Sequence, residues 1–410
     1  MTHPLLRLDK LTLYFTTTRE RSMVHKKAIA YSVSFAAFLG PFTQTVYVPI
    51  LPELQDTLAT SQLLINASIS VFTFIIAFMQ ILYGPLTDSL GRKKVLLPGI
   101  ALYVAASIGC FYADHIASLL FFRVFQAVGI ATGSVVAVTV IGDLFRDEER
   151  LKAMGTFQMM VALGPVIGPV AGGFIAGHFD YHMVFLALAI AGALIGILNL
   201  ALLRETKPTG PARRIDMAEY ARIARDRQGL TIGILGFVQF YIYYNFLVYL
   251  PVILDQGYTL SVAQKGLMFL PLSVALVLGS FLSSRVQKRL STESLLVITA
   301  LLCAIDVVAF LVTAAHSLTL LIATTFLFGL LLGLSLPAQT ALLTRIFVTH
   351  RATAVGLYNF FRFMGMACGP FLGALLFSLG GLTLLFSIAA LLFLLIALLT
   401  WRNLMATQRT

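Results

Sequence analysis

Apolar segments long enough to cross a lipid bilayer recur along the entire chain, and this feature limits the fold more than any other. A helix needs about 20 consecutive apolar residues to cross a hydrocarbon core about 30 Å thick. Of the 410 residues, 59% are hydrophobic and 11% are charged, against about 25% charged residues in soluble domains. The sequence therefore predicts an all-α polytopic membrane protein. Twelve transmembrane helices are predicted, at residues 28–51, 62–86, 95–113, 117–142, 153–177, 182–203, 229–254, 264–284, 294–314, 317–344, 352–378 and 381–401.

The positive charges of the chain are concentrated in alternate loops. Of the 29 lysines and arginines, 26 lie in the two termini or in the loops after the second, fourth, sixth, eighth and tenth apolar segments. Loops rich in lysine and arginine are retained on the cytoplasmic side of a membrane. We therefore expect an integral protein of the cell membrane, inner or plasma, with both termini in the cytoplasm. The placement of lysine and arginine in alternate loops explains the net charge of +11, so we expect no nucleic-acid partner.

A polar loop at residues 204–228 divides the twelve segments into six and six. We predict a cytoplasmic N-terminal segment (1–27), a first six-helix bundle (28–203), this inter-bundle loop, a second six-helix bundle (229–401) and a cytoplasmic tail (402–410). We expect the loop to act mainly as a tether, although its sequence IDMAEYARIARD is compatible with a short amphipathic helix. Because six is even, both bundles enter the membrane in the same sense. Transporters use such a parallel repeat with a site between the halves.

The two halves repeat a pattern of glycines and prolines with an offset of 201 residues. In each half, three glycines at positions i, i+4 and i+8 share one helix face, and a neighbouring helix can approach such a face to backbone contact. The proline in each pattern removes one backbone hydrogen bond and bends the helix. A helix-dimer seam is the alternative, although it requires neither the prolines nor the repeat. Gly155 lies half a turn from the shared face and is expected to make a separate contact. The pattern consists of Gly155, Gly164, Gly168, Pro169, Gly172 and Gly173 in the first half and Gly365, Gly369, Pro370 and Gly373 in the second.

Four motifs, in order along the chain, resemble those of one transporter family. The pattern G-x8-G-x3-G-P-x2-G-G, from Gly155 to Gly173, resembles the antiporter motif in the fifth helix of drug–proton antiporters of the major facilitator superfamily. GPLTDSLGRKK (84–94), RVFQAVG (123–129) and VYVPILP (46–52) resemble its loop, helix 4 and helix 1 motifs. The chain is thus similar to the twelve-helix branch that includes bicyclomycin- and chloramphenicol-resistance proteins. The resemblance implies two pseudo-symmetric six-helix bundles.

The loop motif implies a conformational latch. In the family, the aspartate that corresponds to Asp88 meets the positive N-terminal end of helix 11 when the transporter is closed to the cytoplasm, which is a charge–dipole contact. The resemblance also implies that Arg92 pairs with Asp143, and that Gly84 and Gly91 complete the motif. A set of solvated loop charges is the alternative.

Proton coupling requires a group that can titrate within the membrane. Arg123 lies inside the fourth segment, where a buried arginine is costly and is a functional candidate by default, and the resemblance implies a proton-relay region there. Snorkelling of its side chain to the interface is the alternative. Many relatives carry an aspartate where this chain has Thr45. Asp306 is the one carboxylate well inside a predicted span, and burial favours its protonated form. It is either a coupling residue or a structural partner of a polar neighbour.

The substrate site is expected between the bundles, lined by polar and aromatic side chains. Gln158 and Asn359 are again 201 residues apart, so each half contributes one amide. Arg362 has no acidic residue in its own predicted helix, which favours an anionic or hydrogen-bonding substrate. The candidates are Gln44, Tyr47, Gln158, Tyr243, Asn245, Asn359 and Arg362.

These features predict a transporter rather than an enzyme. We expect proton-coupled efflux of small, mostly lipophilic compounds by alternating access, as in a multidrug-type antiporter. A carrier of one metabolite, such as a sugar, siderophore or purine, is the alternative with the same fold. A membrane-embedded enzyme is disfavoured because all seven histidines lie in termini or at loop edges, without metal-ligand spacing. We therefore expect no cofactor and no catalytic or metal site. The expected partners of this functional monomer are a small-molecule substrate, protons and the lipid bilayer.

Overall fold

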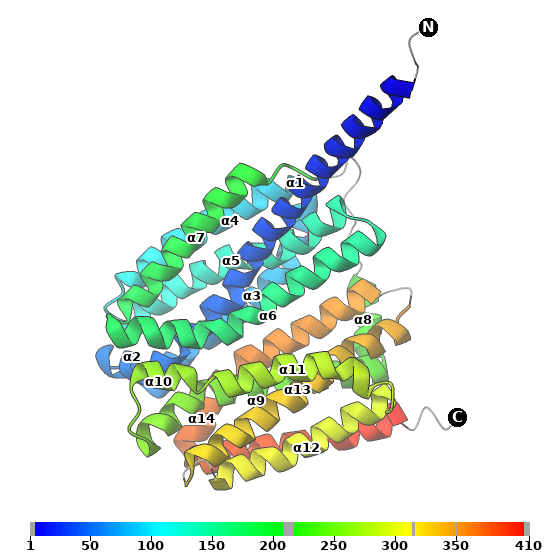
Figure 1. The fold of residues 1–410 in the computed structure, drawn as a ribbon. Coiled ribbons are helices and arrows are strands. Elements are labelled where there is room, and N and C mark those ends of the chain that lie inside the picture. The colour runs from blue at the N-terminus through cyan, green and yellow to red at the C-terminus, as the bar shows by residue number, and fades with distance from the viewer. Residues whose placement is uncertain (1–4, 208–216, 314–315, 349–350, 406–410) are drawn as a thin grey trace.

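The computed structural model describes residues 5–207, 217–313, 316–348 and 351–405 of the chain (Figure 1). Within these ranges the chain is almost entirely helical and contains no β-strand. The first half forms α1 (Leu5–Thr45), the 3₁₀ helix η1 (Val48–Ile50), α2 (Leu51–Thr57), α3 (Gln62–Leu90), α4 (Arg92–Phe111), α5 (Ile116–Leu144), α6 (Asp147–His178) and α7 (His182–Leu202). The second half forms α8 (Met217–Arg225), α9 (Arg227–Gly257), α10 (Val262–Leu267), α11 (Leu270–Val286), α12 (Thr292–Thr313), α13 (Leu318–Ile346), α14 (Arg351–Thr400) and a π-helical turn, η2 (Trp401–Met405).

Eleven helical stretches in the described ranges are long and apolar enough to cross a membrane. The last of them, Thr353–Met405, is 53 residues long and contains the final two predicted spans. Its backbone leaves the helical conformation at Gly380 and Gly381, and the φ angle of Gly381 is +63°. Glycine adopts such an angle readily because it has no Cβ atom. This break separates the two spans, so the all-α polytopic fold with twelve spans is confirmed.

The spans form two six-helix bundles, which lie one above the other in Figure 1. The first bundle contains α1 and α3 to α7. The second contains α9 to α14, with α10 and α11 in one span and two spans in α14. The most extensive helix contacts lie within the bundles, between α9 and α14, α11 and α13, α4 and α5, and α1 and α6. This architecture agrees with the predicted division into six and six, while the residue boundaries of the predicted domains stay predictions.

Both described ends of the chain, the start of α1 and η2, lie on the same side of the molecule, which we call the termini face (Figure 1). The short helix α8 also lies on this face. The short helices α2 and α10 lie at the other end of the bundles, which we call the opposite face. The helix α6 starts at the termini face and runs to the opposite face, whereas α14 starts at the termini face and returns to it after the break at Gly380 and Gly381.

Two predicted spans are interrupted, and a proline explains each interruption. The span predicted at 28–51 ends as a regular helix at Thr45, because Pro49 lacks a backbone donor and the chain turns through η1 into α2. The span predicted at 264–284 is divided between α10, which ends at Leu267, and α11, because Pro271 has no N–H to donate to the backbone oxygen of Leu267 and instead lies in the first turn of α11.

The structure is also more helical than predicted outside the spans. The helix α1 already begins at Leu5, so most of the predicted polar segment 1–27 is helical. In the inter-bundle loop, α8 forms where we mainly expected a tether. Residues 208–216 of that loop lie outside the described ranges.

Candidate functional site

On the opposite face, a buried asparagine joins the two bundles. Asn66, near the start of α3, is 0% exposed. Its side-chain amide donates to the hydroxyl of Tyr249 on α9 at 3.3 Å and to the backbone oxygen of Pro370 on α14 at 3.4 Å. One side chain of the first bundle is therefore bonded to two helices of the second.

Glycines bring α6 and α10 to backbone contact on the same face. A Cβ atom on Gly173 would lie 2.8 Å from the backbone oxygen of Val262 and 3.0 Å from the Cα atom of Gly266. A Cβ atom on Gly266 would lie 2.7 Å from the backbone oxygen of Pro169. Such separations are shorter than real Cβ atoms tolerate, so this contact between the bundles requires glycine on both helices.

The prolines of α6 add a polar contact between the bundles. Pro169 has no N–H, so the backbone oxygen of Pro165, four residues earlier, has no helical donor. The hydroxyl of Ser273 on α11 donates to this oxygen at 3.1 Å. A neighbouring helix can satisfy a carbonyl that a proline leaves free in a membrane. Pro169 therefore supports a contact between the bundles as well as the bend expected from the sequence.

Two motif glycines nearer the termini face have no close neighbour on another helix. A Cβ atom on Gly84 in α3, or on Gly155 in α6, would meet no described atom of another helix within 4 Å. The separate contact expected for Gly155 is therefore not made in this conformation. The glycines of α6 and α10 on the opposite face thus bring the bundles into backbone contact, whereas Gly84 and Gly155 make no such contact.

The repeated glycine faces pack inside each bundle. The three spaced glycines of α6 face α1, and those of α14 face α9 in the same way. A Cβ atom on Gly164 would lie 2.8 Å from the backbone nitrogen of Phe42, and one on Gly369 would lie 2.6 Å from the backbone oxygen of Tyr241. Helices of the same chain thus cover both faces, and a second chain is not needed to explain them. The six glycines are Gly164, Gly168, Gly172, Gly365, Gly369 and Gly373.

On the termini face, Arg92 at the start of α4 binds two carboxylates. Its Nε donates to Oδ2 of Asp143, at the end of α5, at 2.8 Å, and its Nη2 lies 3.2 Å from Oδ1 of Asp88 in α3. Arg92 is only 4% exposed, so these charges attract one another with little screening by water. The pair of Arg92 and Asp143 implied by the loop motif is present, and Asp88 pairs within its own bundle in this conformation.

Glu205, which follows α7, caps the start of α4 and was not among the predicted site residues. Its Oε1 accepts hydrogen bonds from the backbone N–H of Arg92 at 2.8 Å and from those of Thr206 and Lys207 at 3.1 Å. Burial raises the pKa of Glu205, but these backbone donors and that of Lys93 together outweigh burial and hold the pKa below its ordinary value of 4.5. The carboxylate also meets the positive end of α4.

The capping geometry requires glycine at position 91. The φ angle of Gly91 is +109°, and a Cβ atom there would lie 2.5 Å from Oε2 of Glu205. Thr206 adds a hydrogen bond from its hydroxyl to Oδ2 of Asp143 at 2.9 Å. The start of the inter-bundle loop is therefore bonded to the latch residues. The only signal in the sequence was the charged stretch RETK (204–207), directly after the sixth apolar segment.

Arg123 in α5 lies in the core of the first bundle and is 0% exposed. It donates to Oε1 of Gln126 at 2.5 Å and to the hydroxyl of Tyr47 at 2.9 Å, and its guanidinium lies 3.9 Å from the ring centre of Phe72. Gln126 in turn donates to the hydroxyl of Ser107 at 2.8 Å. Complete burial excludes snorkelling in this conformation. Arg123 takes part in none of the ion pairs among the described residues.

In the second bundle, Arg362 on α14 lies against aromatic side chains of α9. Its Cζ is 4.2 Å from the ring centre of Phe240, and its Nη1 donates to Oδ1 of Asn359 at 3.2 Å. The 3₁₀ helix η1, which begins directly after Tyr47 of the first bundle, contacts α9. Arg362 and the residues next to Tyr47 therefore approach the same helix, α9, from the second and the first bundle, and Arg362 and Tyr47 are both predicted site residues.

The other predicted cavity residues have different environments. Gln44 donates to the hydroxyl of Thr73 inside the first bundle at 2.8 Å, and Asn245 donates to a backbone oxygen of its own helix at 2.9 Å. Gln158 is exposed on α6, whereas Tyr243 is buried. In this conformation Gln44 and Asn245 take part in internal packing, while Gln158 is the most accessible of these residues.

Asp306 is buried in α12 and is 2% exposed. Neither of its carboxyl oxygens has a hydrogen-bond partner among the residues that the structure describes. Burial without a donor disfavours the ionised form of a carboxyl group. The helix α12 packs against α13, α14 and η2, all in the second bundle. Asp306 is therefore remote from the region between the bundles.

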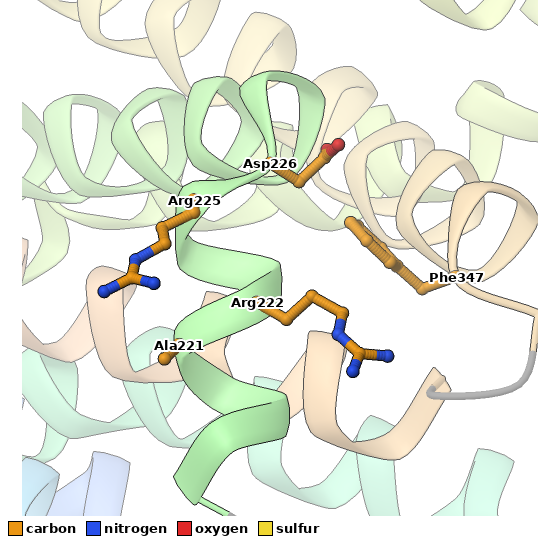
Figure 2. A pocket seen from close by; sticks show the side chains of 5 residues that line it. All are labelled: Ala221, Arg222, Arg225, Asp226 and Phe347. Atoms are coloured by element: carbon orange, nitrogen blue, oxygen red, sulfur yellow. The ribbon is translucent and has the colours of Figure 1, made fainter.

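A separate pocket of about 590 Å³ lies beside α8 (Figure 2). It is lined by Ala221, Arg222 and Arg225 of α8, by Asp226 and by Phe347. The carboxylate of Asp226 caps α9 by accepting hydrogen bonds from two backbone N–H groups. Because α8 packs on α9 and α14, this pocket belongs to the termini face of the second bundle.

Comparison with known sequences shows to which protein family this chain is similar. The profile of the Major Facilitator Superfamily matches residues 33–315 and residues 232–410. The chain is 26% identical over 331 residues to the uncharacterized MFS-type transporter YdgK of Bacillus subtilis, across 77% of this chain and 80% of YdgK. It is 30% identical over 180 residues to the multidrug resistance protein MdtL of Escherichia coli O81, across 44% of this chain and 46% of MdtL.

Solved structures share the architecture. A bacterial homolog of the human lysosomal transporter Spinster, in an inward-facing and occupied conformation, matches with a TM-score of 0.77 and 16% identity, over 92% of this chain and 97% of that chain. The human organic anion transporter MFSD10 matches with a TM-score of 0.67 and 17% identity, over 92% and 99% of the two chains. At these identities the similarity concerns the fold.

Proposed function

The chain belongs to the Major Facilitator Superfamily, and on this premise we propose that it exports small, mostly lipophilic compounds in exchange for protons. It is a transporter and not an enzyme; the direction, the cargo and the exchanged ion are the proposal. The glycine–proline pattern, which resembles an antiporter motif, supports exchange, and the similarity to MdtL supports efflux of drug-like compounds. The positive charges of alternate loops support a cytoplasmic termini face.

The observation that carries the proposal is the set of contacts that joins the two bundles on the opposite face. Backbone contact at Gly173 and Gly266, together with the hydrogen bonds of Asn66, holds the bundles together on the opposite face. Rigid bundles that contact each other at one end can exchange this contact for one at the other end. In the proposed cycle, this conformation receives cargo from the cytoplasm, and the reverse arrangement releases it outside.

We assign proton coupling to two buried groups. The carboxyl group of Asp306 has no hydrogen-bond partner among the described residues. Binding or release of a proton there would change the charge of a buried group where α12 packs against α13 and α14. Arg123 holds a hydrogen-bond network that includes Tyr47, near the inter-bundle region. Neither group needs to touch the cargo, because each acts through the helices that surround the site.

The proposal is tested with purified protein in proteoliposomes that enclose a pH-sensitive dye. After a pH gradient is imposed, adding cationic, neutral and anionic lipophilic compounds in turn should collapse the gradient faster than in protein-free vesicles for at least one class. Asp306→Asn should abolish this effect, while Asp114→Asn, which changes an aspartate with an 81% exposed side chain, should retain it. Absence of compound-driven proton movement for all three classes would refute proton exchange.

A further inference from the structure

Two adjacent polar side chains of α14 have hydrogen-bonding groups without a partner. Tyr358 is 3% exposed, and its hydroxyl has no partner among the described residues; the same holds for Nε of Arg362. The two residues are four positions apart, so they share one face of the helix. Buried polar groups without partners are uncommon in proteins and require a specific explanation. A ligand that accepts hydrogen bonds from both groups would provide one.

The charge of Arg362 also has no counterion. Arg362 takes part in none of the ion pairs between described residues, and its one hydrogen bond among them goes to the neutral amide of Asn359 at 3.2 Å. Asp306 is the single carboxylate inside the twelve predicted spans, and its oxygens contact no described donor. A partly buried cation without an anionic partner is unfavourable. An anionic ligand would supply the negative charge that these helices lack.

Aromatic surface surrounds the guanidinium. Its Cζ lies 4.2 Å from the ring centre of Phe240 and 5.5 Å from that of Tyr358. Gly236 of α9 makes room for this arrangement, because a Cβ atom there would lie 2.6 Å from the ring of Tyr358 and 3.2 Å from Cγ of Arg362. A ligand at this position would meet a cation and a hydroxyl at one end and aromatic rings beside them. The helix α9, which carries Phe240, also contacts η1 of the first bundle.

We propose that Arg362 and Tyr358 form a binding site for the negatively charged group of the cargo, and that the transported compounds are amphipathic organic anions. A carboxylate or sulfonate would accept hydrogen bonds from the guanidinium and from the Tyr358 hydroxyl. The apolar part of the same molecule would lie along Phe240. This inference rests on the proposed export function and narrows its cargo to one chemical class.

The test compares three naphthalene compounds of similar size and different charge: 2-naphthalenesulfonate, trimethyl-2-naphthylammonium and the neutral 2-acetylnaphthalene. Equilibrium dialysis against the purified full-length protein should show tighter binding of the sulfonate than of the ammonium compound, by about tenfold or more. Arg362→Gln should weaken sulfonate binding by about tenfold or more, and Arg362→Lys should restore part of it. Arg402→Gln removes an exposed arginine of η2 and should have no effect.

Tyr358→Phe provides a second variant that keeps the aromatic packing and removes only the hydroxyl. It should weaken sulfonate binding by about threefold to tenfold, and it decides the question if Arg362→Gln does not fold. Sulfonate binding that is unchanged in correctly folded Arg362→Gln or Tyr358→Phe protein would overturn the inference.

Transport of the same three compounds separates this inference from the proposed function. Proton-coupled export of the ammonium or neutral compound, without binding of the sulfonate, would overturn the anion site and leave the export function standing. Failure of all three compounds to bind or to move protons would overturn both.

Discussion

Replacing Gly173 by alanine should move the protein towards the conformation that is open on the opposite face. Gly173 on α6 lies against the second bundle, and its new Cβ atom would approach the backbone oxygen of Val262 to 2.8 Å and the Cα atom of Gly266 to 3.0 Å. Both are backbone atoms, so no side-chain rotation can relieve the overlap and the helices must separate. This separation opens the opposite face. The substitution therefore destabilises the conformation that is closed on the opposite face and does not affect the conformation that is open there.

The expected magnitude follows from the cost of overpacking. One additional carbon in a closely packed interface costs about 1–3 kcal/mol, which changes a ratio of two conformations by about 5- to 150-fold. The preceding residue provides a matched control, because a Cβ atom on Gly172 would overlap the backbone oxygen of Val46 in the same bundle. Gly172→Ala should therefore lower the melting temperature without selecting a conformation. Gly155→Ala, which fills open space, should change neither quantity.

Spin labels across the termini face measure the effect. Exposed positions are available at Glu148, at the start of α6, and at Arg289, after α11. After replacement of the three native cysteines, double electron–electron resonance between labels at these positions should show a larger population of short distances in Gly173→Ala than in the wild type. The reasoning fails if the distance distribution of Gly173→Ala is unchanged, or if Gly172→Ala shifts it equally.

Arg123→Met should abolish transport and lower the stability by about 1–3 kcal/mol, because it leaves the buried Oε1 of Gln126 without its donor; a variant with normal transport and melting temperature would show that the network is dispensable. Glu205 has a lowered pKa, so its contribution to stability is present above its ordinary value of 4.5 and is lost as the pH falls through the folded pKa. Glu205→Gln should therefore reduce the loss of melting temperature between about pH 6 and about pH 4, and identical pH profiles for the two proteins would contradict this role. Asp306→Leu should leave the melting temperature unchanged or raise it, since no hydrogen bond to a described residue is lost; a clear decrease would reveal a partner of the carboxyl group.

Much of the architecture could be read from local patterns. The apolar segments of α4, α5 and α12 predicted their helices because a helix satisfies its own backbone hydrogen bonds in a membrane without help from other residues. The glycine faces of α6 and α14 predicted close packing, since the absence of Cβ atoms is a property of the residues themselves. The pairing of Arg92 with Asp143 was implied by a motif, although its residues are 51 positions apart.

The sequence by itself determined the number of spans and their division into two repeated halves. It also determined which loops carry the lysines and arginines. Each of these properties depends on the composition of short segments. The tertiary structure alone decided which partner each residue meets. Gly172 and Gly173 are consecutive and identical, yet one lies against Val46, directly after α1, and the other against α10 of the second bundle, because successive helical positions point about 100° apart. In the same way, the position of Glu205 at the start of α4 and the unpartnered hydroxyl of Tyr358 arise from contacts between distant segments, for which no local pattern provides a signal.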